Sequence, residues 1–148
     1  MAIEDSYNFR RVSDTLTTSG VVGSKRLKEL SALGYQAVIN LLPDSSDFAV
    51  ADERALVESQ CIAYVHIPVD FERPARSDFE QFVAAMENID QKKLHIHCAA
   101  NYRVSVFYSL YAQGKGLWDA EAASSYVSSV WEPGDYPGWP DFIAEILG

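Results

Sequence analysis

Residues 94–105 read LHIHCAANYRVS, and the organisation of the whole chain can be inferred outward from this stretch. Its first part is a short apolar run, which predicts a buried strand. From Val104 onward, apolar residues recur at helical spacing. The alternation along the strand separates two sets of side chains, with Leu94, Ile96 and Cys98 on one face and His95 and His97 on the other.

Short strands and helices are predicted to alternate along the rest of the chain. The pattern favours strands over residues 9–12, 16–18, 37–42 and 62–69, the first two as edge strands, and helices over residues 24–33, 48–58, 78–86, 104–113, 118–131 and 141–147. This order is typical of an α/β domain with helices flanking a mostly parallel sheet, here of four to five strands. Ligands bind at the carboxyl ends of the strands in such sheets, and Cys98 stands at one of these ends.

Composition limits both the number of domains and the class of partner. With 148 residues, 48% of them hydrophobic, the chain is long enough for one core, so we expect a single domain over residues 1–148. A net charge of −9 argues against binding to nucleic acid or to an anionic membrane, both of which need clustered Lys and Arg. We predict a cytoplasmic protein, because the chain has two cysteines, no export signal at residues 1–5 and no long apolar run. The oligomeric state is left open.

The segment between the strand and the helix has the chemistry of an oxyanion site. Backbone N–H groups of a tight loop and of a first helical turn converge on one centre, and the helix dipole adds positive charge there. Such surroundings stabilise the thiolate of Cys98, which is the form that attacks. Arg103 offers a planar fork for two phosphate oxygens, and Ser105 offers a hydroxyl that helps the thiolate leave. We expect His97 to orient the loop rather than to transfer protons.

The residues expected to contact the bound substrate are His97, Ala99, Ala100, Asn101, Tyr102, Arg103 and Val104. Cleavage of a phosphoester also requires an acid for the leaving oxygen. Asp70 is the first candidate because it follows the preceding predicted strand, with Glu72 and Asp78 as substitutes. We expect no metal and no cofactor, since His95 and His97 have no third ligand nearby.

Taken together, these residues resemble the cysteine-dependent phosphatases of the dual-specificity type, whose loop reads His-Cys, five residues, Arg, then Ser or Thr. The likeness is greatest to a small bacterial phosphatase-like family allied to them. It extends over most of the chain, through residues 18–20, 34–42, 67–70, 97–105 and 118–122. The resemblance implies a dual-specificity-phosphatase-like fold and a phosphate-containing substrate or other oxyanion as partner. It implies Cys98 as nucleophile, Arg103 as phosphate clamp, Ser105 as leaving-group assistant and Asp70 as general acid.

The loop departs from the phosphatase pattern in its length. Four residues separate Cys98 from Arg103, and Asn101 lies near the position of the usual glycine. Asn tolerates the left-handed conformation better than most residues do. Two alternatives to phosphoester hydrolysis follow from the shorter loop. One is an anion-binding module with impaired turnover, and the other is a sulfurtransferase similar to rhodanese domains, many of which have a loop of this length.

Two features outside the loop are open to more than one interpretation. Cys61 is expected to be an inert core thiol, with a protective disulfide to Cys98 as the alternative. The aromatic residues near the end of the chain, Trp131, Tyr136 and Trp139, are expected to pack over the core, with a cover for the site as the alternative.

Overall fold

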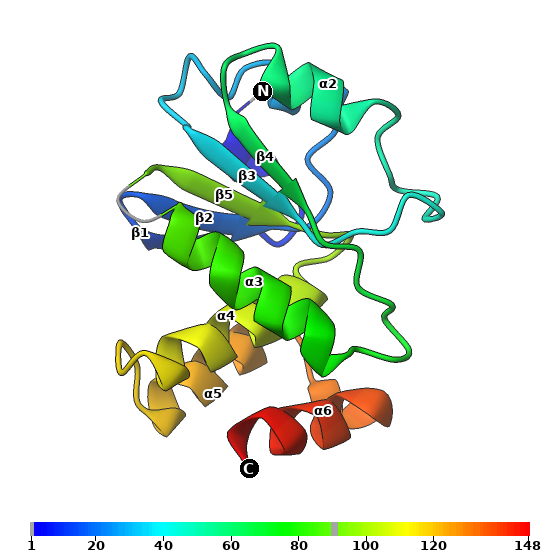
Figure 1. Ribbon diagram of the computed structural model, residues 1–148, viewed down its shortest axis with the longest axis vertical. Coiled ribbons are helices and arrows are strands. Elements are labelled where there is room, and N and C mark those ends of the chain that lie inside the picture. Colours follow the sequence, from blue (N-terminus) through cyan, green and yellow to red (C-terminus); the bar gives the residue numbers. More distant parts are fainter. Residues whose placement is uncertain (1, 90–91) are drawn as a thin grey trace.

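The computed structural model describes residues 2–89 and 92–148, and five strands and six α-helices are described in these ranges (Figure 1). The strands are β1 (Arg10–Ser13), β2 (Leu16–Ser19), β3 (Ala37–Asn40), β4 (Ala63–His66) and β5 (Leu94–His97). The helices are α1 (Ser24–Leu27), α2 (Glu53–Glu58), α3 (Arg76–Asn88), α4 (Tyr102–Gly114), α5 (Ala120–Val130) and α6 (Gly138–Leu147). Two short 3-10 turns cover Ile3–Asp5 and Pro133–Asp135.

All strands belong to one sheet with the order β1-β2-β5-β3-β4. β1 pairs antiparallel with β2, and the other three pairings are parallel, which confirms the predicted α/β class. The register brings the last residues of the four parallel strands into one row, formed by Ser19, His97, Asn40 and His66. The segments that follow these residues therefore meet at one edge of the sheet, where α/β proteins bind their ligands.

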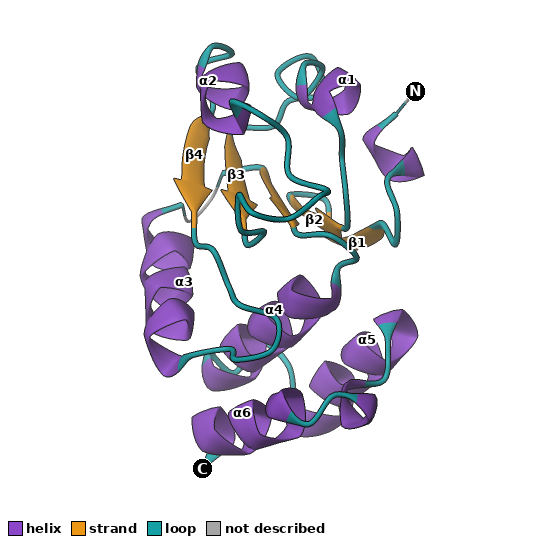
Figure 2. Ribbon diagram, turned by 90° about the vertical axis from the view of Figure 1, so that its right-hand side faces the viewer, coloured by secondary structure: helices purple, strands orange, loops and turns teal. Residues whose placement is uncertain are grey.

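Helices cover both faces of the sheet. Figure 2 shows α1 and α2 on one side and α3 to α6 on the other. On the side of the sheet covered by α3 to α6, a large hydrophobic cluster contains Ile96, Cys98 and Phe107, together with Trp139 from α6. The smaller cluster on the α1 and α2 side contains Leu27, Leu30, Val38 and Val57. The three inner strands β2, β5 and β3 are thus buried on both faces, as parallel strands between helices are expected to be.

Three expectations about the elements need correction. The strand near residues 16–18 is not at an edge, because β2 lies between β1 and β5. The helix predicted over residues 48–58 is confined to Glu53–Glu58, since a looped segment occupies most of residues 41–52. The helix predicted over residues 24–33 is a single turn, Ser24–Leu27, followed by irregular turns. In the described part of the chain, no helix combines the length and apolar character needed to span a bilayer.

Candidate active site

The predicted loop joins β5 to α4 at the carboxyl edge of the sheet (Figure 1). β5 ends at His97 and α4 begins at Tyr102, so residues 98–101 alone turn the chain from strand to helix. Cys98 is only 1% exposed, and it belongs to the cluster that contains Ile96 and Val104. The thiol is therefore held away from bulk water, a few residues before the first turn of a helix.

Asn101 is the N-cap of α4 and takes the left-handed conformation, with φ 69° and ψ 5°, as its residue type predicts. Its buried side chain donates through Nδ2 to the Asn8 carbonyl at 2.9 Å and to Thr18 Oγ1 at 3.0 Å. Thr18 also hydrogen-bonds Tyr126, whose pKa burial raises to about 12. The Asn101 side chain thus anchors the loop to the N-terminal part of the chain and to β2.

The loop carbonyls are hydrogen-bonded to the N-terminal part of the chain. The Ala99 carbonyl accepts from the Val21 amide at 2.9 Å, and the Ala100 carbonyl accepts from Asn8 Nδ2 at 3.0 Å. The described peptide bonds are all trans, so the Ala100 N–H points away from the Val21 side. The first intrahelical bond of α4 comes from the Ser105 amide to Asn101, which leaves the amides of residues 102–104 without a helical acceptor. These amides are available to an anion.

Gly20 allows the N-terminal segment to approach the loop this closely. A Cβ at residue 20 would lie 2.4 Å from the Ala99 carbonyl oxygen and 2.8 Å from the Ala100 Cα. Both atoms are backbone, so the neighbours cannot give way by a side-chain rotation. The residue that follows β2 must therefore lack a side chain.

Gly20→Ala is expected to lower the free energy of unfolding by about 1–3 kcal/mol, because a methyl group forced against backbone strains the loop. The same change should weaken the thermal stabilisation of the protein by inorganic phosphate. Denaturant unfolding and thermal melts with and without phosphate measure both effects. Gly114→Ala is the matched control, since a Cβ there meets no atom within 4 Å. Wild-type stability and phosphate response in Gly20→Ala would contradict the role of this contact.

Arg103 is the cation of the loop, and its guanidinium lies over the Phe71 ring at 5.2 Å from the centroid. Its Nε atom is buried and has no hydrogen-bond partner, and among the described residues no carboxylate forms an ion pair with this side chain. A guanidinium in a protein of net charge −9 that lacks a carboxylate partner is free to bind an external anion. The role of Arg103 as an anion clamp stays a prediction.

Ser105 is fully buried, and its hydroxyl is engaged away from the thiol. Ser105 Oγ donates to the Tyr102 carbonyl at 2.8 Å and accepts from Trp131 Nε1 at 3.0 Å. The sequence predicts that this hydroxyl assists the thiolate of Cys98. In the structure this hydroxyl donates to the Tyr102 carbonyl instead, a bond to the preceding helical turn that serine side chains often make.

Aromatic side chains from the end of the chain pack beside the loop. Tyr102 stacks on Trp131 at 4.4 Å between centroids, and Phe71 contacts Trp131, Tyr136 and Trp139 at 5.2–5.7 Å. Trp131 and Trp139 are buried, whereas Tyr136 is 41% exposed. The expectation that the tail packs over the core is confirmed for the two tryptophans, and Tyr136 stands at the surface next to Tyr102.

The candidate acids lie on the segment that follows β4. Asp70 is exposed, and one carboxylate oxygen accepts from the Glu72 amide at 3.0 Å. It precedes Phe71, whose ring contacts Arg103, but no contact links the Asp70 carboxylate to Cys98 or Arg103. Asp78 is half-buried in the first turn of α3, where burial raises its pKa, with a smaller contribution from the negative charge of Asp70. Glu72 is exposed to solvent.

The two histidines of β5 have different partners. His95 is bonded through Nδ1 to Thr17 and through Nε2 to Ser19, both at 2.8 Å, and burial drives its pKa well below 6.5. His97 Nε2 lies 2.6 Å from a carboxylate oxygen of Glu53, and both side chains are buried. Within the described ranges, no group of three or more His, Cys, Asp or Glu side chains has the arrangement of a metal site.

Cys61 is exposed, so the expectation of a core thiol is wrong. It follows α2 in a turn and has a positive φ of 62°, which places its backbone outside the sheet.

Three residues that contact the loop region could not be predicted from the sequence. For Phe71, the one indication in the sequence is its position after Asp70. Nothing in the sequence indicates Asn8 or Glu53, because the residues that they contact lie 92 and 44 positions away in the chain.

The family described as "Beta-lactamase hydrolase-like protein, phosphatase-like domain" matches residues 8–115, a range that contains the loop. No curated protein matches the chain significantly. A candidate phosphatase (DUF442) from Shewanella putrefaciens CN-32 is 34% identical, with a TM-score of 0.87, over 97% of this chain and 93% of that one.

More distant structures share the fold. Tk-PTP in its active form is 19% identical, with a TM-score of 0.74, over 93% of this chain and 95% of that chain. TpbA of P. aeruginosa, crystallised with pTyr, is 18% identical, with a TM-score of 0.71, over 92% of this chain and 82% of that chain. The described strands and helices thus follow the architecture expected from the sequence.

Proposed function

Because the chain belongs to the family of beta-lactamase hydrolase-like protein, phosphatase-like domains, we propose that it hydrolyses a phosphate monoester through a phosphoenzyme on Cys98. One observation above all supports this proposal. Arg103 lies in the first turn of α4, where the amides lack helical acceptors, and its guanidinium has no carboxylate partner in the part of the chain that the structure describes. A cation and several N–H donors at one place suit the three non-bridging oxygens of a phosphoryl group.

In the first step, the Cys98 thiolate attacks phosphorus and forms a P–S bond, while the bond from phosphorus to the leaving oxygen breaks. The leaving oxygen takes a proton from Asp70, the proposed general acid. Arg103 holds two non-bridging oxygens as charge redistributes in the transition state. In the second step, water attacks phosphorus, Asp70 accepts its proton, and the P–S bond breaks to release inorganic phosphate and the thiolate.

The proposal is tested by capture of the phosphoenzyme. Wild-type protein is mixed with an aryl phosphate, quenched in acid within a turnover, digested and analysed by mass spectrometry. We expect steady release of phosphate and one phosphoryl group on the peptide that contains Cys98, with none on the peptide that contains Cys61. Release of phosphate with the phosphoryl group on any other residue would refute the mechanism, and no release from any phosphate monoester would refute the reaction.

A second function is favoured by the bonds of Ser105. Its hydroxyl donates to the Tyr102 carbonyl, so a departing thiolate finds no hydroxyl hydrogen there in this conformation. An anion-binding module that retains the loop but turns over poorly would have this feature. It predicts stabilisation by inorganic phosphate in thermal melts together with no release of phosphate from an aryl phosphate, and the hydrolysis assay therefore separates it from the phosphatase.

A further inference from the structure

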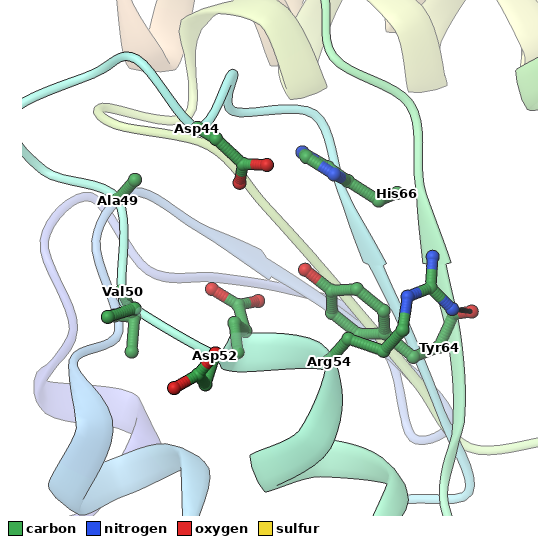
Figure 3. Close-up of a pocket in the computed structure, with 9 residues that line it drawn as sticks. Asp44, Ala49, Val50, Asp52, Arg54, Tyr64 and His66 are labelled. Carbon is green, nitrogen blue, oxygen red and sulfur yellow. Dashed lines mark hydrogen bonds between the residues drawn. The ribbon is translucent and has the colours of Figure 1, made fainter.

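The segment that follows β4 carries Asp70, the proposed general acid, and β3 together with the residues after it holds the start of this segment. His66, which lines the pocket of about 370 Å³ shown in Figure 3, donates through Nε2 to the Leu42 carbonyl at 2.7 Å. The Val69 amide donates to the Leu41 carbonyl at 3.0 Å. The chain therefore reaches Asp70 from a fixed position beside the sheet.

The helix α6 holds the segment on the other side of Asp70. Trp139 lies in the first turn of α6 and is fully buried. Its Nε1 donates to the Phe71 carbonyl at 2.8 Å, and the two rings are in contact at 5.6 Å between centroids. Both interactions act on the residue that directly follows Asp70.

Gly138 brings the start of α6 against the next residue of the same segment. A Cβ at residue 138 would lie 2.7 Å from the Glu72 carbonyl oxygen, which is closer than Cβ contacts in proteins come. Farther along α6, Glu145 accepts from the Arg76 guanidinium through its carboxylate at 3.1 Å and through its carbonyl at 2.8 Å. α6 thus contacts the segment in its middle and at the start of α3.

The segment held in this way lies against the loop between β5 and α4. The Phe71 ring lies 5.2 Å from the Arg103 guanidinium and 6.3 Å from the Tyr102 ring. The Asp70 carboxylate accepts from the Glu72 amide at 3.0 Å, a bond within its own turn. The place of this carboxylate relative to the loop therefore depends on the backbone that carries it. A displacement of about 1 Å at a reacting group can lower a rate about a hundredfold.

We propose that Trp139 is a positioning residue for the acid step, because its indole N–H fixes the backbone directly after Asp70. The close approach at Gly138 allows α6 to reach that backbone. The inference deepens the proposed function and rests on it, since it takes Asp70 as the acid. An acid contributes most when the leaving oxygen is strongly basic. Loss of the Trp139 hydrogen bond should therefore slow the reaction of poor leaving groups selectively.

The test compares kcat/KM for two substrates, because this ratio covers the steps up to departure of the leaving group. Phenyl phosphate has a basic leaving oxygen, whereas dinitrophenolate departs without a proton. In Trp139→Phe, kcat/KM should fall about tenfold for phenyl phosphate and less than about twofold for dinitrophenyl phosphate. Gly138→Ala, which forces the Glu72 carbonyl away, should show the same selectivity. Wild-type values, or equal losses for both substrates, in the folded variants would overturn the proposal.

Each variant has a matched control. Trp118→Phe makes the same change at a tryptophan that packs on Tyr108 and Tyr126, and it should leave both kcat/KM values unchanged. Gly114→Ala is the control for Gly138→Ala, since a Cβ there meets no atom within 4 Å.

A double variant shows whether Trp139 acts through Asp70. Asp70→Asn alone should lower kcat/KM for phenyl phosphate, and Trp139→Phe added to it should cause no further loss. Two losses that multiply would place the effect of Trp139 outside the acid step and would also overturn the proposal.

Backbone order parameters from nitrogen relaxation test the contact without a substrate. In the wild type, residues 70–73 should reach about 0.85, the value of rigid backbone, and Trp139→Phe should lower them. Wild-type values below about 0.6 would refute the role of Trp139 even where neither variant folds. A wild-type protein that releases no phosphate but has an ordered segment loses the proposed function and retains the contact. A protein that forms the phosphoenzyme while both variants lose equally on the two substrates keeps the function and loses the role.

Discussion

Cys98→Ser is expected to abolish hydrolysis of an aryl phosphate, with a loss of about a thousandfold or more in kcat. A serine hydroxyl stays protonated at neutral pH and is a far weaker nucleophile than a thiolate. Because Cys98 is buried and has no polar partner among the described side chains, an oxygen in place of sulfur should leave the surrounding packing nearly unchanged. The loss should therefore appear in kcat, whereas stabilisation by inorganic phosphate in thermal melts should remain.

Cys61→Ser is the control for this prediction, because Cys61 is the other cysteine of the chain and is exposed. We expect wild-type turnover from it. Equal background rates from the wild type and Cys98→Ser would mean that the thiol is no nucleophile for this substrate class. Equal loss in both cysteine variants would point instead to a disulfide or to a requirement for overall thiol content.

The second large effect is expected at Arg103. Arg103→Ala should lower kcat/KM by about a hundredfold to a thousandfold, since one donor to a developing oxyanion contributes that much. Arg103→Lys should recover little of it, because a lysine ammonium keeps the charge but cannot contact two oxygens through a planar fork. Both variants should also lose most of the thermal stabilisation that phosphate gives the wild type. Steady-state kinetics and melts at fixed ionic strength measure the two effects.

Arg11→Ala is the matched control for Arg103. The Arg11 guanidinium also lies over a phenylalanine ring, that of Phe9 at 5.8 Å, but on β1 at the edge of the sheet. It tests whether loss of any arginine from an aromatic face disturbs the protein. A wild-type phosphate response in Arg103→Ala would show that the loop amides bind the anion without this side chain.

The sequence predicts the part of the site that is local in the chain. The alternation over residues 94–98 and the helical spacing after Val104 locate the loop, and the conformational tolerance of Asn101 predicts its left-handed turn. The sequence cannot predict the partners that come from elsewhere. The sequence pattern does not reveal that α2 starts at Glu53, because the apolar residues of the preceding irregular segment extend the predicted helix back over residues 48–52. A carboxylate in the middle of that predicted helix gives no reason to expect burial.

Side-chain hydrogen bonds are the other part that sequence analysis cannot supply. Ser105 falls in register with the hydroxyl of the phosphatase loop, but the direction of its hydrogen depends on Trp131, which comes from a separate helix end. The exposure of Cys61 likewise follows from the turn after α2, not from its residue type. Hydrophobic pattern determines which face of an element is buried, whereas these details depend on contacts between elements.

The long-range contacts that hold the loop between β5 and α4 affect how the protein folds. Asn8 contacts Ala100 across 92 residues, and Thr18 contacts Tyr126 across 108. We expect contacts of this span to form late in folding, because closing such long loops has an entropic cost that comes before the contacts stabilise the native state. A ribosome-bound chain that lacks its last helices has residues 98–103 but not the tyrosine that holds Thr18. We therefore expect the proposed anion site to form only when the two ends of the chain have docked, so that stabilisation by phosphate would report completed folding.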